Sequence, residues 1–171
     1  MDWSSLGSVA ELRPYREGDR DAVLSFSCTT PGLNFTRDAQ RVIRSAPDLV
    51  GEVADDEVWI GLATIPRVGI VGVVVYHGQV FGVTGESIVR PFIAALGIRR
   101  DYRRRGIGTS LKIAAMRDMA DRGLVGPTVS LVDRRNHAMP QLNTTRFEAK
   151  VEPDPEVFND RIVMVSIEPV D

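Results

Sequence analysis

The residues best suited to chemistry in this sequence are a run of arginines that leads into two closely spaced glycines. The segment reads Arg99-Arg100-Asp101-Tyr102-Arg103-Arg104-Arg105-Gly106-Ile107-Gly108-Thr109. Where glycines open a helix, free main-chain N–H groups and the positive end of the helix dipole attract anions. Glycine also lets an anionic ligand approach the main chain closely, and arginine adds charge-assisted hydrogen bonds. The segment therefore predicts a binding site for a pyrophosphate group.

Two expected elements would hold this segment in place. Residues Pro91–Ile98 form a continuous apolar run, which is typical of a strand buried on both faces. After the glycines, apolar residues recur at helical spacing until Gly123, which predicts the end of that helix. This apolar stripe consists of Ile107, Leu111, Ala114, Ala115 and Met119. A strand, a basic turn and an amphipathic helix thus frame the candidate site.

The glycine spacing excludes a P-loop and argues against a dinucleotide-binding unit. It is not the G-x-x-x-x-G-K-[ST] pattern of a P-loop. Nor is it G-x-G-x-x-G with an acidic residue after the next strand, the fingerprint of a dinucleotide-binding unit.

The segment resembles motif A of the GNAT superfamily of N-acetyltransferases, which is written Q/R-x-x-G-x-G/A. The motif is matched by Arg103-Arg104-Arg105-Gly106-Ile107-Gly108, and the preceding Leu96-Gly97-Ile98 is similar to the L-x-V of the family's strand. The resemblance implies that the turn and helix hold the pyrophosphate of coenzyme A, with Arg103 close to phosphate and with Arg99 and Arg100 facing water. The implied coenzyme-binding residues are Leu96, Gly97, Ile98, Arg103, Arg104, Arg105, Gly106, Ile107, Gly108, Thr109, Asn136 and Asn143.

Further features extend the resemblance over roughly residues 9–168. Leu12-Arg13-Pro14 and Glu17-Gly18-Asp19 look like the family's first strand and its turn into a helix. The segment from Asn136 to Asn143 is similar to N-x-x-A/M-x-x-L-Y/N, whose asparagine often binds the pantetheine arm, and Phe147 fits the G-F before the last hairpin. The chain departs from the family at Asn143, where many relatives have a tyrosine that protonates the leaving thiolate, and at Arg146, which replaces the glycine.

The resemblance implies an acetyl-CoA-dependent N-acetyltransferase that acts on a primary amine by direct attack, without an acyl-enzyme. An alkylamine has a pKa of about 10.4 and must lose a proton before it attacks. Glu86, or a water molecule that it holds, is the expected general base, and an N–H near Ile98 is expected to bind the oxyanion. The thiol needs little help to leave, so water or Thr144 could replace the missing tyrosine.

Two alternatives from other classes stay open. One is a coenzyme A-binding module without catalysis, which the missing tyrosine favours. The other is an arginine-rich nucleic-acid binder, but this would need a wider basic surface with interleaved aromatics, and Tyr102 is the only aromatic residue in the run.

The apolar patterns predict an α/β fold. Together with the resemblance, they imply a mixed, mostly antiparallel sheet of about seven strands, flanked by helices and splayed at the acetyl-CoA cleft. Helices are expected from Asp19, with Ala22, Val23 and Phe26 inward, from Thr36 to Ser45 with Pro47 past its end, and at 140–145. Strands are expected at 9–13, 49–54, 58–65, 70–76, 91–98, 127–132, 147–151 and 162–167. By the resemblance, the helices between 19 and 45 and a glycine-rich loop from Gly78 to Pro91 should line the acceptor site.

Other candidate groups have ordinary structural interpretations. Cys28 is expected to be a buried or loop residue rather than a nucleophile, and His77 to lie in a surface turn. One cysteine and two histidines cannot form a Cys/His metal cluster, so no metal site is predicted.

Length and composition are those of one globular domain spanning 1–171. Hydrophobic residues make up 43% and charged residues 26%, which excludes a disordered chain. The net charge of −2 argues against a nucleic-acid partner. No apolar run approaches the ~20 residues of a membrane span, so no membrane partner is expected. With no signal-peptide pattern, a cytoplasmic protein is expected. Its partner would be a small-molecule or peptide amine, and a homodimer, common among relatives, stays open.

Overall fold

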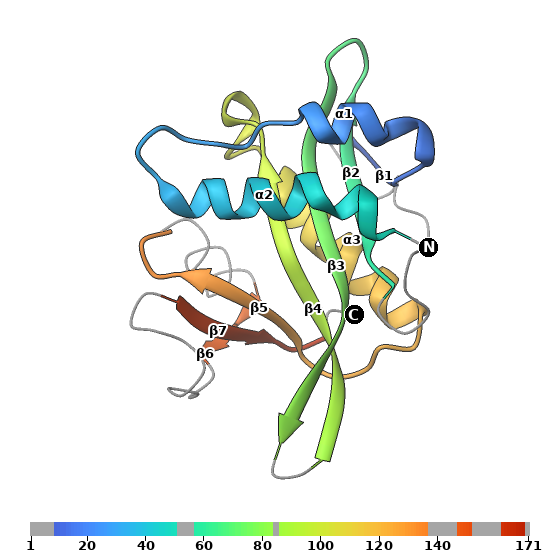
Figure 1. Cartoon of the computed structure of the whole chain (residues 1–171), viewed down its shortest axis with the longest axis vertical. Helices are drawn as coiled ribbons and strands as arrows, with labels where there is room; N and C mark the ends of the chain where they lie inside the picture. Colours follow the sequence, from blue (N-terminus) through green and yellow to red (C-terminus); the bar gives the residue numbers. More distant parts are fainter. Residues whose placement is uncertain (1–8, 51–56, 84–85, 137–146, 152–161, 170–171) are drawn as a thin grey trace.

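A computed structural model describes residues 9–50, 57–83, 86–136, 147–151 and 162–169. Its centre is one seven-stranded sheet in the order β1-β2-β3-β4-β5-β7-β6 (Figure 1). All neighbouring strands are antiparallel except the parallel pair β4 and β5. The strands are β1 (Glu11–Pro14), β2 (Trp59–Ile65), β3 (Gly69–Val83), β4 (Glu86–Ile98), β5 (Thr128–Asp133), β6 (Lys150–Val151) and β7 (Ile162–Ile167). The expected mixed, mostly antiparallel α/β fold is confirmed, and one of its strands, β6, has only two residues.

Helices cover both faces of the sheet (Figure 1). On one face lie α1 (Arg20–Ser25) and α2 (Asn34–Leu49), and on the other lies α3 (Ile107–Asp121). Each face has its own hydrophobic core: Val23, Phe26 and Ile43 belong to the first, and the five residues of the α3 stripe belong to the second. That stripe is buried throughout, as its spacing predicts, and Gly123 follows the helix with φ +86°.

The N-terminal expectations hold in part. The first strand is β1, which includes Pro14; proline is tolerated there because β1 is an edge strand. Val23 and Phe26 are buried in or beside α1, but Ala22 is exposed, because α1 has six residues and only one side of it meets the core.

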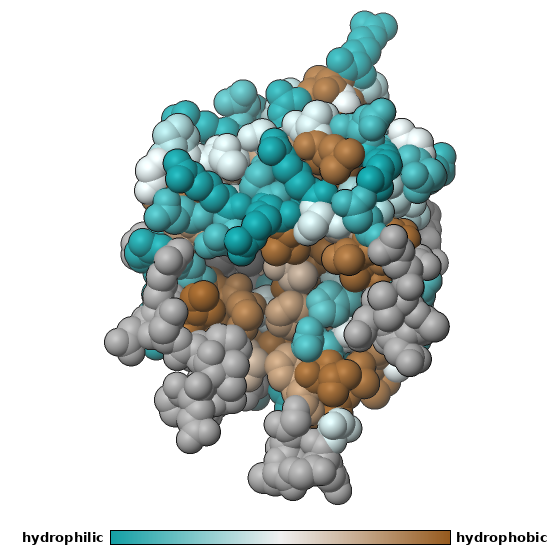
Figure 2. Space-filling view, in the orientation of Figure 1, coloured by the Kyte–Doolittle hydropathy of each residue, from teal (hydrophilic) through white to brown (hydrophobic). Residues whose placement is uncertain are grey.

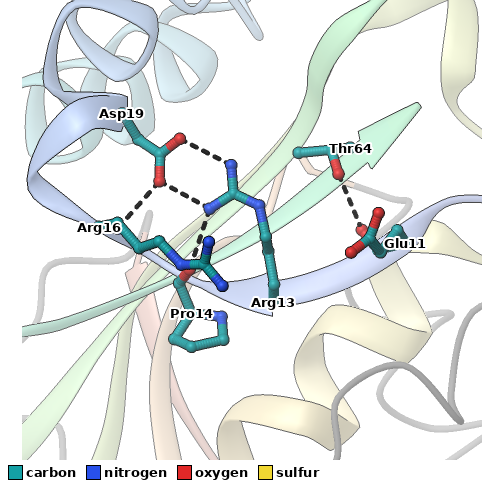
Figure 3. Close-up of polar contacts among 6 residues, drawn as sticks. All are labelled: Glu11, Arg13, Pro14, Arg16, Asp19 and Thr64. Carbon is teal, nitrogen blue, oxygen red and sulfur yellow. Dashed lines mark hydrogen bonds and ion pairs between the residues drawn. The ribbon is translucent and has the colours of Figure 1, made fainter. Parts of the chain in front are cut away.

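Asp19 does more than begin α1. Its carboxylate accepts two hydrogen bonds of 2.6 Å from the guanidinium of Arg13 and one of 2.9 Å from the N–H of Arg16 (Figure 3). These bonds fix the turn between β1 and α1, and the hydrogen bonds from Arg13, in particular, lower the pKa of Asp19.

The second expected helix is longer than the sequence indicates. It begins at Asn34 and continues through Pro47 to Leu49, so Pro47 does not lie past its end. Proline lacks the N–H that would bond to the carbonyl of Ile43, but Ala46 and Pro47 are both buried, and their packing offsets that loss. The strand expected at 49–54 is therefore wrong at Leu49, while 51–56 lie outside the described residues.

The expectation of a glycine-rich loop from Gly78 to Pro91 is also wrong, because most of these residues belong to strands. Here β3 and β4 form a long hairpin whose register runs from Gly72↔Ile98 to Val83↔Glu86. Gly78 is part of this ladder, opposite Pro91, and a Cβ there would lie 3.0 Å from Val89 Cγ1. His77 does not lie in a turn: it is part of β3, and its ring is 5.2 Å from that of Phe92 on β4.

The C-terminal strands agree more closely. β5 and β7 differ from their expected bounds by at most one residue at each end. Only Lys150 and Val151 of the expected strand 147–151 are paired, and they lie at the sheet edge. The helix expected at 140–145 lies outside the described residues.

Candidate functional site

The parallel pair of strands separates soon after it forms. β4 and β5 pair at Phe92↔Val129 and Ile93↔Ser130, but β4 continues to Ile98 and β5 to Asp133 (Figure 1). In the described part of the chain, no ladder pair joins the strands beyond Ile93. The two strands therefore diverge, and one edge of β4 has no partner strand among the described residues; the space beside this edge is the candidate cleft.

A β-bulge marks the point of separation. In the β3–β4 ladder, Tyr76 is opposite Ile93 and Val75 is opposite Ala95, so Ala94 is an extra residue on β4. A bulge bends its strand and increases its twist. Because Ala94 directly follows the last residue paired with β5, the bulge turns β4 away from β5 where the cleft begins.

The main chain of the open edge has a definite polarity. The N–H of Arg99 donates to the carbonyl of Val71 on β3 over 2.9 Å. Successive residues of an antiparallel strand direct their polar groups to opposite sides. The N–H and C=O groups of Ile98 and Leu96 therefore point away from β3, and on that side Ile98 O accepts a hydrogen bond of 3.1 Å from the guanidinium of Arg103. An extended ligand can bond to this edge as a further strand would.

The turn after β4 exposes the start of α3. Gly106 is the N-cap residue with φ +79°, a left-handed conformation that glycine adopts without strain. Gly106 has no side chain to cap the helix, and no described residue accepts a hydrogen bond from the first-turn N–H groups of Ile107, Gly108 and Thr109, which are therefore suited to bind an anion. A Cβ on Gly108 would lie 3.6 Å from Ile98 Cγ1, so the helix N-terminus adjoins the open end of β4.

The arginines of the turn have different roles. The guanidinium carbons of Arg99 and Arg105 each lie 5.2 Å from the ring centroid of Tyr102. Arg104 is exposed, with φ 62°.

Arg103 has partners that the sequence did not indicate. Its guanidinium donates to Ile98 O at 3.1 Å, Thr30 Oγ1 at 2.7 Å and Cys28 O at 2.6 Å. These acceptors, none of which adjoins Arg103 in sequence, direct the guanidinium toward Ile98 and the connection between α1 and α2, and a contact of this side chain with phosphate stays a prediction. A contact from the Arg103 main chain to the coenzyme stays a prediction.

The remaining predicted residues are distributed unevenly. Gly97 lies on β4 with no room for a Cβ. Asn136 follows β5, half-buried, and its N–H donates to the carbonyl of Asp133 at 2.8 Å. Asn143 and Thr144 lie outside the described residues.

Glu86 begins β4 at the far end of the hairpin, opposite Val83. At about 3.3 Å per residue, the eight steps from there to Ala94 span roughly 26 Å. The main chain of Glu86 therefore lies far from the bulge at Ala94, and its role as a general base stays a prediction.

Sequence reasoning missed the polar groups that hold the connection between α1 and α2. Gln40 is buried; its Nε2 donates to the carbonyl of Phe26 at 2.6 Å and its Oε1 accepts the N–H of Cys28 at 2.8 Å. The available signal was a polar residue in the inward-facing stripe of α2, between Thr36 and Ile43. Burial raises the pKa of Cys28, which agrees with a structural rather than a nucleophilic thiol.

The surface around the cleft is mixed. Figure 2 shows hydrophilic side chains gathered over α2, whereas hydrophobic side chains are visible in the hollow beneath it, over the strands. Among the described residues, no group of three or more His, Cys, Asp or Glu side chains could hold a metal ion. No helix in the described ranges is both long and apolar enough to cross a membrane.

The structure is a mixed α/β sheet in which a parallel strand pair diverges beside a glycine-opened helix N-terminus. The Acetyltransferase (GNAT) family model matches residues 34–142, which is more than half of the 171-residue chain. The chain therefore belongs to the GNAT acetyltransferase family.

Solved structures share this fold at low sequence identity. The PaiA N-acetyltransferase of Thermoplasma acidophilum in complex with coenzyme A is 13% identical, with 92% of this chain and 98% of that chain covered and a TM-score of 0.61. A GNAT-family acetyltransferase of Staphylococcus aureus Mu50 is 10% identical, with 95% and 100% covered and a TM-score of 0.67. A NatC complex bound to Gag peptide and CoA is 13% identical, with 94% and 98% covered and a TM-score of 0.57. No curated protein sequence matches the chain.

Proposed function

We propose that this protein is an acetyl-CoA-dependent N-acetyltransferase, formed as a single domain by residues 1–171. The observation that carries the proposal is the open edge of β4 beside the uncapped start of α3. Coenzyme A joins a pyrophosphate to an extended pantetheine arm with two amides, so it suits both features. The first-turn N–H groups of α3 would hold the pyrophosphate, and the N–H and C=O of Leu96 and the N–H of Ile98 would pair with the arm as an added strand.

Family membership and the coenzyme A-bound relatives support the same donor. One relative is bound to a peptide as well as to CoA, which supports an amine acceptor of the peptide or small-molecule kind. The apolar hollow under α2 gives the acyl end of the donor a surface that excludes water (Figure 2).

The reaction is a direct transfer. The lone pair of the neutral amine attacks the thioester carbonyl carbon, a C–N bond forms, and the C–S bond breaks to release the thiolate. The ammonium proton passes to water, and the thiolate takes a proton in turn. With a thiol pKa of about 8.5, the leaving group needs no strong acid. N–H groups at the open edge of β4 would stabilise the oxyanion.

Two measurements test the proposal. Calorimetry should detect acetyl-CoA binding, and a thiol-release assay over small-molecule and peptide amines should identify at least one acceptor. Acetyl-CoA binding without thiol release from any amine would favour a coenzyme-binding module. Absent CoA affinity with steeply salt-dependent DNA or RNA affinity would favour a nucleic-acid binder.

A further inference from the structure

The connection between α1 and α2 lies directly on the part of β4 that lines the cleft. We call residues Phe26–Thr30 the α1–α2 segment; none of them is in a helix or strand. A Cβ placed on Gly97 of β4 would lie 2.8 Å from Cys28 Sγ and 3.0 Å from Cys28 Cβ. The segment therefore covers the α2-side face of β4 next to the open edge.

From one side, the segment is held by α2. Gln40 bonds to Phe26 and Cys28, and Thr36 Oγ1 accepts the N–H of Thr30 at 3.0 Å. Because α2 follows the segment closely in the chain, these hydrogen bonds are local and set the shape of the segment. They do not link the segment to the turn between β4 and α3, which is the proposed pyrophosphate site.

From the other side, the segment is held by Arg103, which lies in the turn between β4 and α3. Among the described residues of that turn, only Arg103 donates hydrogen bonds to the segment. Two of the three acceptors of its guanidinium, Cys28 O and Thr30 Oγ1, belong to the segment, and the third, Ile98 O, ends β4. The side chain is half-buried, so water reaches these bonds only in part. Arg103 thus joins three parts of the molecule: β4, the turn and the α1–α2 segment.

We propose that Arg103 is a positioning residue, which couples the coenzyme-binding turn to the α1–α2 segment, so that a ligand on the turn restrains the segment. The second part of this proposal, that a ligand on the turn restrains the segment, rests on the proposed function. Anion binding to the N–H groups at the start of α3 fixes the turn, and a fixed turn presents the guanidinium in the one geometry that reaches all three acceptors. Opening of the segment then requires either distortion of the occupied turn or loss of the two hydrogen bonds from Arg103 to Cys28 O and Thr30 Oγ1.

A phosphate-binding Arg103 makes the opposite prediction. If the guanidinium left its three acceptors to contact a pyrophosphate, ligand binding would release the segment. The response of the segment to acetyl-CoA therefore separates the two roles, because one restrains the segment and the other frees it.

Cys28 provides the probe. It is the only cysteine of the chain, its exposed fraction is 3%, and it lies in the centre of the segment. Its rate of alkylation by N-ethylmaleimide, followed by mass spectrometry under native conditions, reports how often the segment opens. Acetyl-CoA is a suitable ligand because its sulfur is acylated and does not consume the reagent.

Without ligand, Arg103→Ala should raise the alkylation rate at least tenfold, whereas Arg100→Ala, in an exposed arginine just before it, should change the rate less than twofold. Thr30→Val removes one acceptor at nearly constant volume and should raise the rate by a smaller factor. Thr29→Val is its matched control, because the Thr29 side chain is exposed and bonds to Ser27 rather than to Arg103. Equal rates for wild type, Arg103→Ala and Thr30→Val would overturn the proposal.

With saturating acetyl-CoA, wild-type alkylation should slow at least threefold, and Arg103→Ala should lose this protection. Arg103→Lys keeps the charge, but its single ammonium group cannot reach three separate acceptors, so it should behave like Arg103→Ala. Faster alkylation of the wild type with acetyl-CoA, or full rescue by lysine, would overturn the proposal in favour of a phosphate contact. If acetyl-CoA does not bind at all, the proposed function fails, and the ligand-free rates alone decide whether Arg103 holds the segment.

Discussion

A negative charge at Gly108 should abolish coenzyme binding without harming the fold. Gly108 lies in the first turn of α3, and a Cβ there would make only ordinary contacts, the nearest at 3.6 Å to Ile98. A carboxylate in the first turn of a helix is itself stabilising, by about 0.3–1 kcal/mol. Gly108→Glu should therefore unfold at or slightly above the wild-type temperature. A pyrophosphate bound at the start of α3 would lie about 5 Å from the new carboxylate. At an effective dielectric of about 20, two unit negative charges at that distance repel by roughly 3 kcal/mol. That energy corresponds to a loss of about 100-fold or more in affinity.

Calorimetric titration with acetyl-CoA, together with thermal unfolding, measures both effects. Gly108→Ala controls for the Cβ, and Gly108→Gln controls for bulk at nearly the same volume without the charge. The Glu defect should shrink in 1 M salt, where the screening length falls to about 3 Å, while any Gln defect should not. Wild-type affinity in a folded Gly108→Glu protein, or an equal loss in Gly108→Gln, would refute an anion site at the start of α3.

Three further predictions concern stability. Burial lowers the pKa of Lys112 to about 7, so between there and about 10.5 the unfolded chain binds more protons and stability should rise with pH; Lys112→Met should remove this rise in urea titrations at pH 7 and 9.5, and an unchanged slope would contradict it. Gly97→Ala places a Cβ 2.7 Å from Ile43 Cδ1 and should lower the free energy of unfolding by about 1–3 kcal/mol, whereas wild-type stability would show that the packing there yields. Since Arg13 lowers the pKa of Asp19, their contribution is present above the carboxyl's unfolded pKa of about 3.9 and is lost as pH falls through the folded pKa; Asp19→Asn should flatten the acid side of the stability profile, and a profile parallel to the wild type would argue against it.

Features governed by local sequence could be predicted. The stripe from Ile107 to Met119 is buried because its spacing matches the helical period. The helix ends before Gly123 because glycine adopts the positive φ of +86° that the chain needs there. The splayed sheet followed from the resemblance, which rested on the glycine motif and the strand before it. These features depend on residues close together in the chain.

Features governed by tertiary contacts could not be predicted. Arg103 was expected to face a phosphate because it lies in a phosphate-binding motif, but its partners Thr30 and Cys28 precede it by 73 and 75 residues. Pro47 was read as a helix terminator, and only its burial explains why the helix continues. No pattern within a few residues records either contact.

The hairpin of β3 and β4 extends well beyond the strands that flank it. β2 begins its pairing with β3 at Tyr76, and β5 pairs with β4 at Phe92 and Ile93, so the ladder from Gln79 to Arg90 is bordered on neither side by another described strand (Figure 1). Its length is consequently free to drift during evolution. Losing or gaining two residues in each strand at the outer end would keep every side chain on its present face and leave both hydrophobic cores untouched. Related chains can therefore carry arms of different reach on the same catalytic body, each bringing a different surface to whatever approaches that end of the molecule.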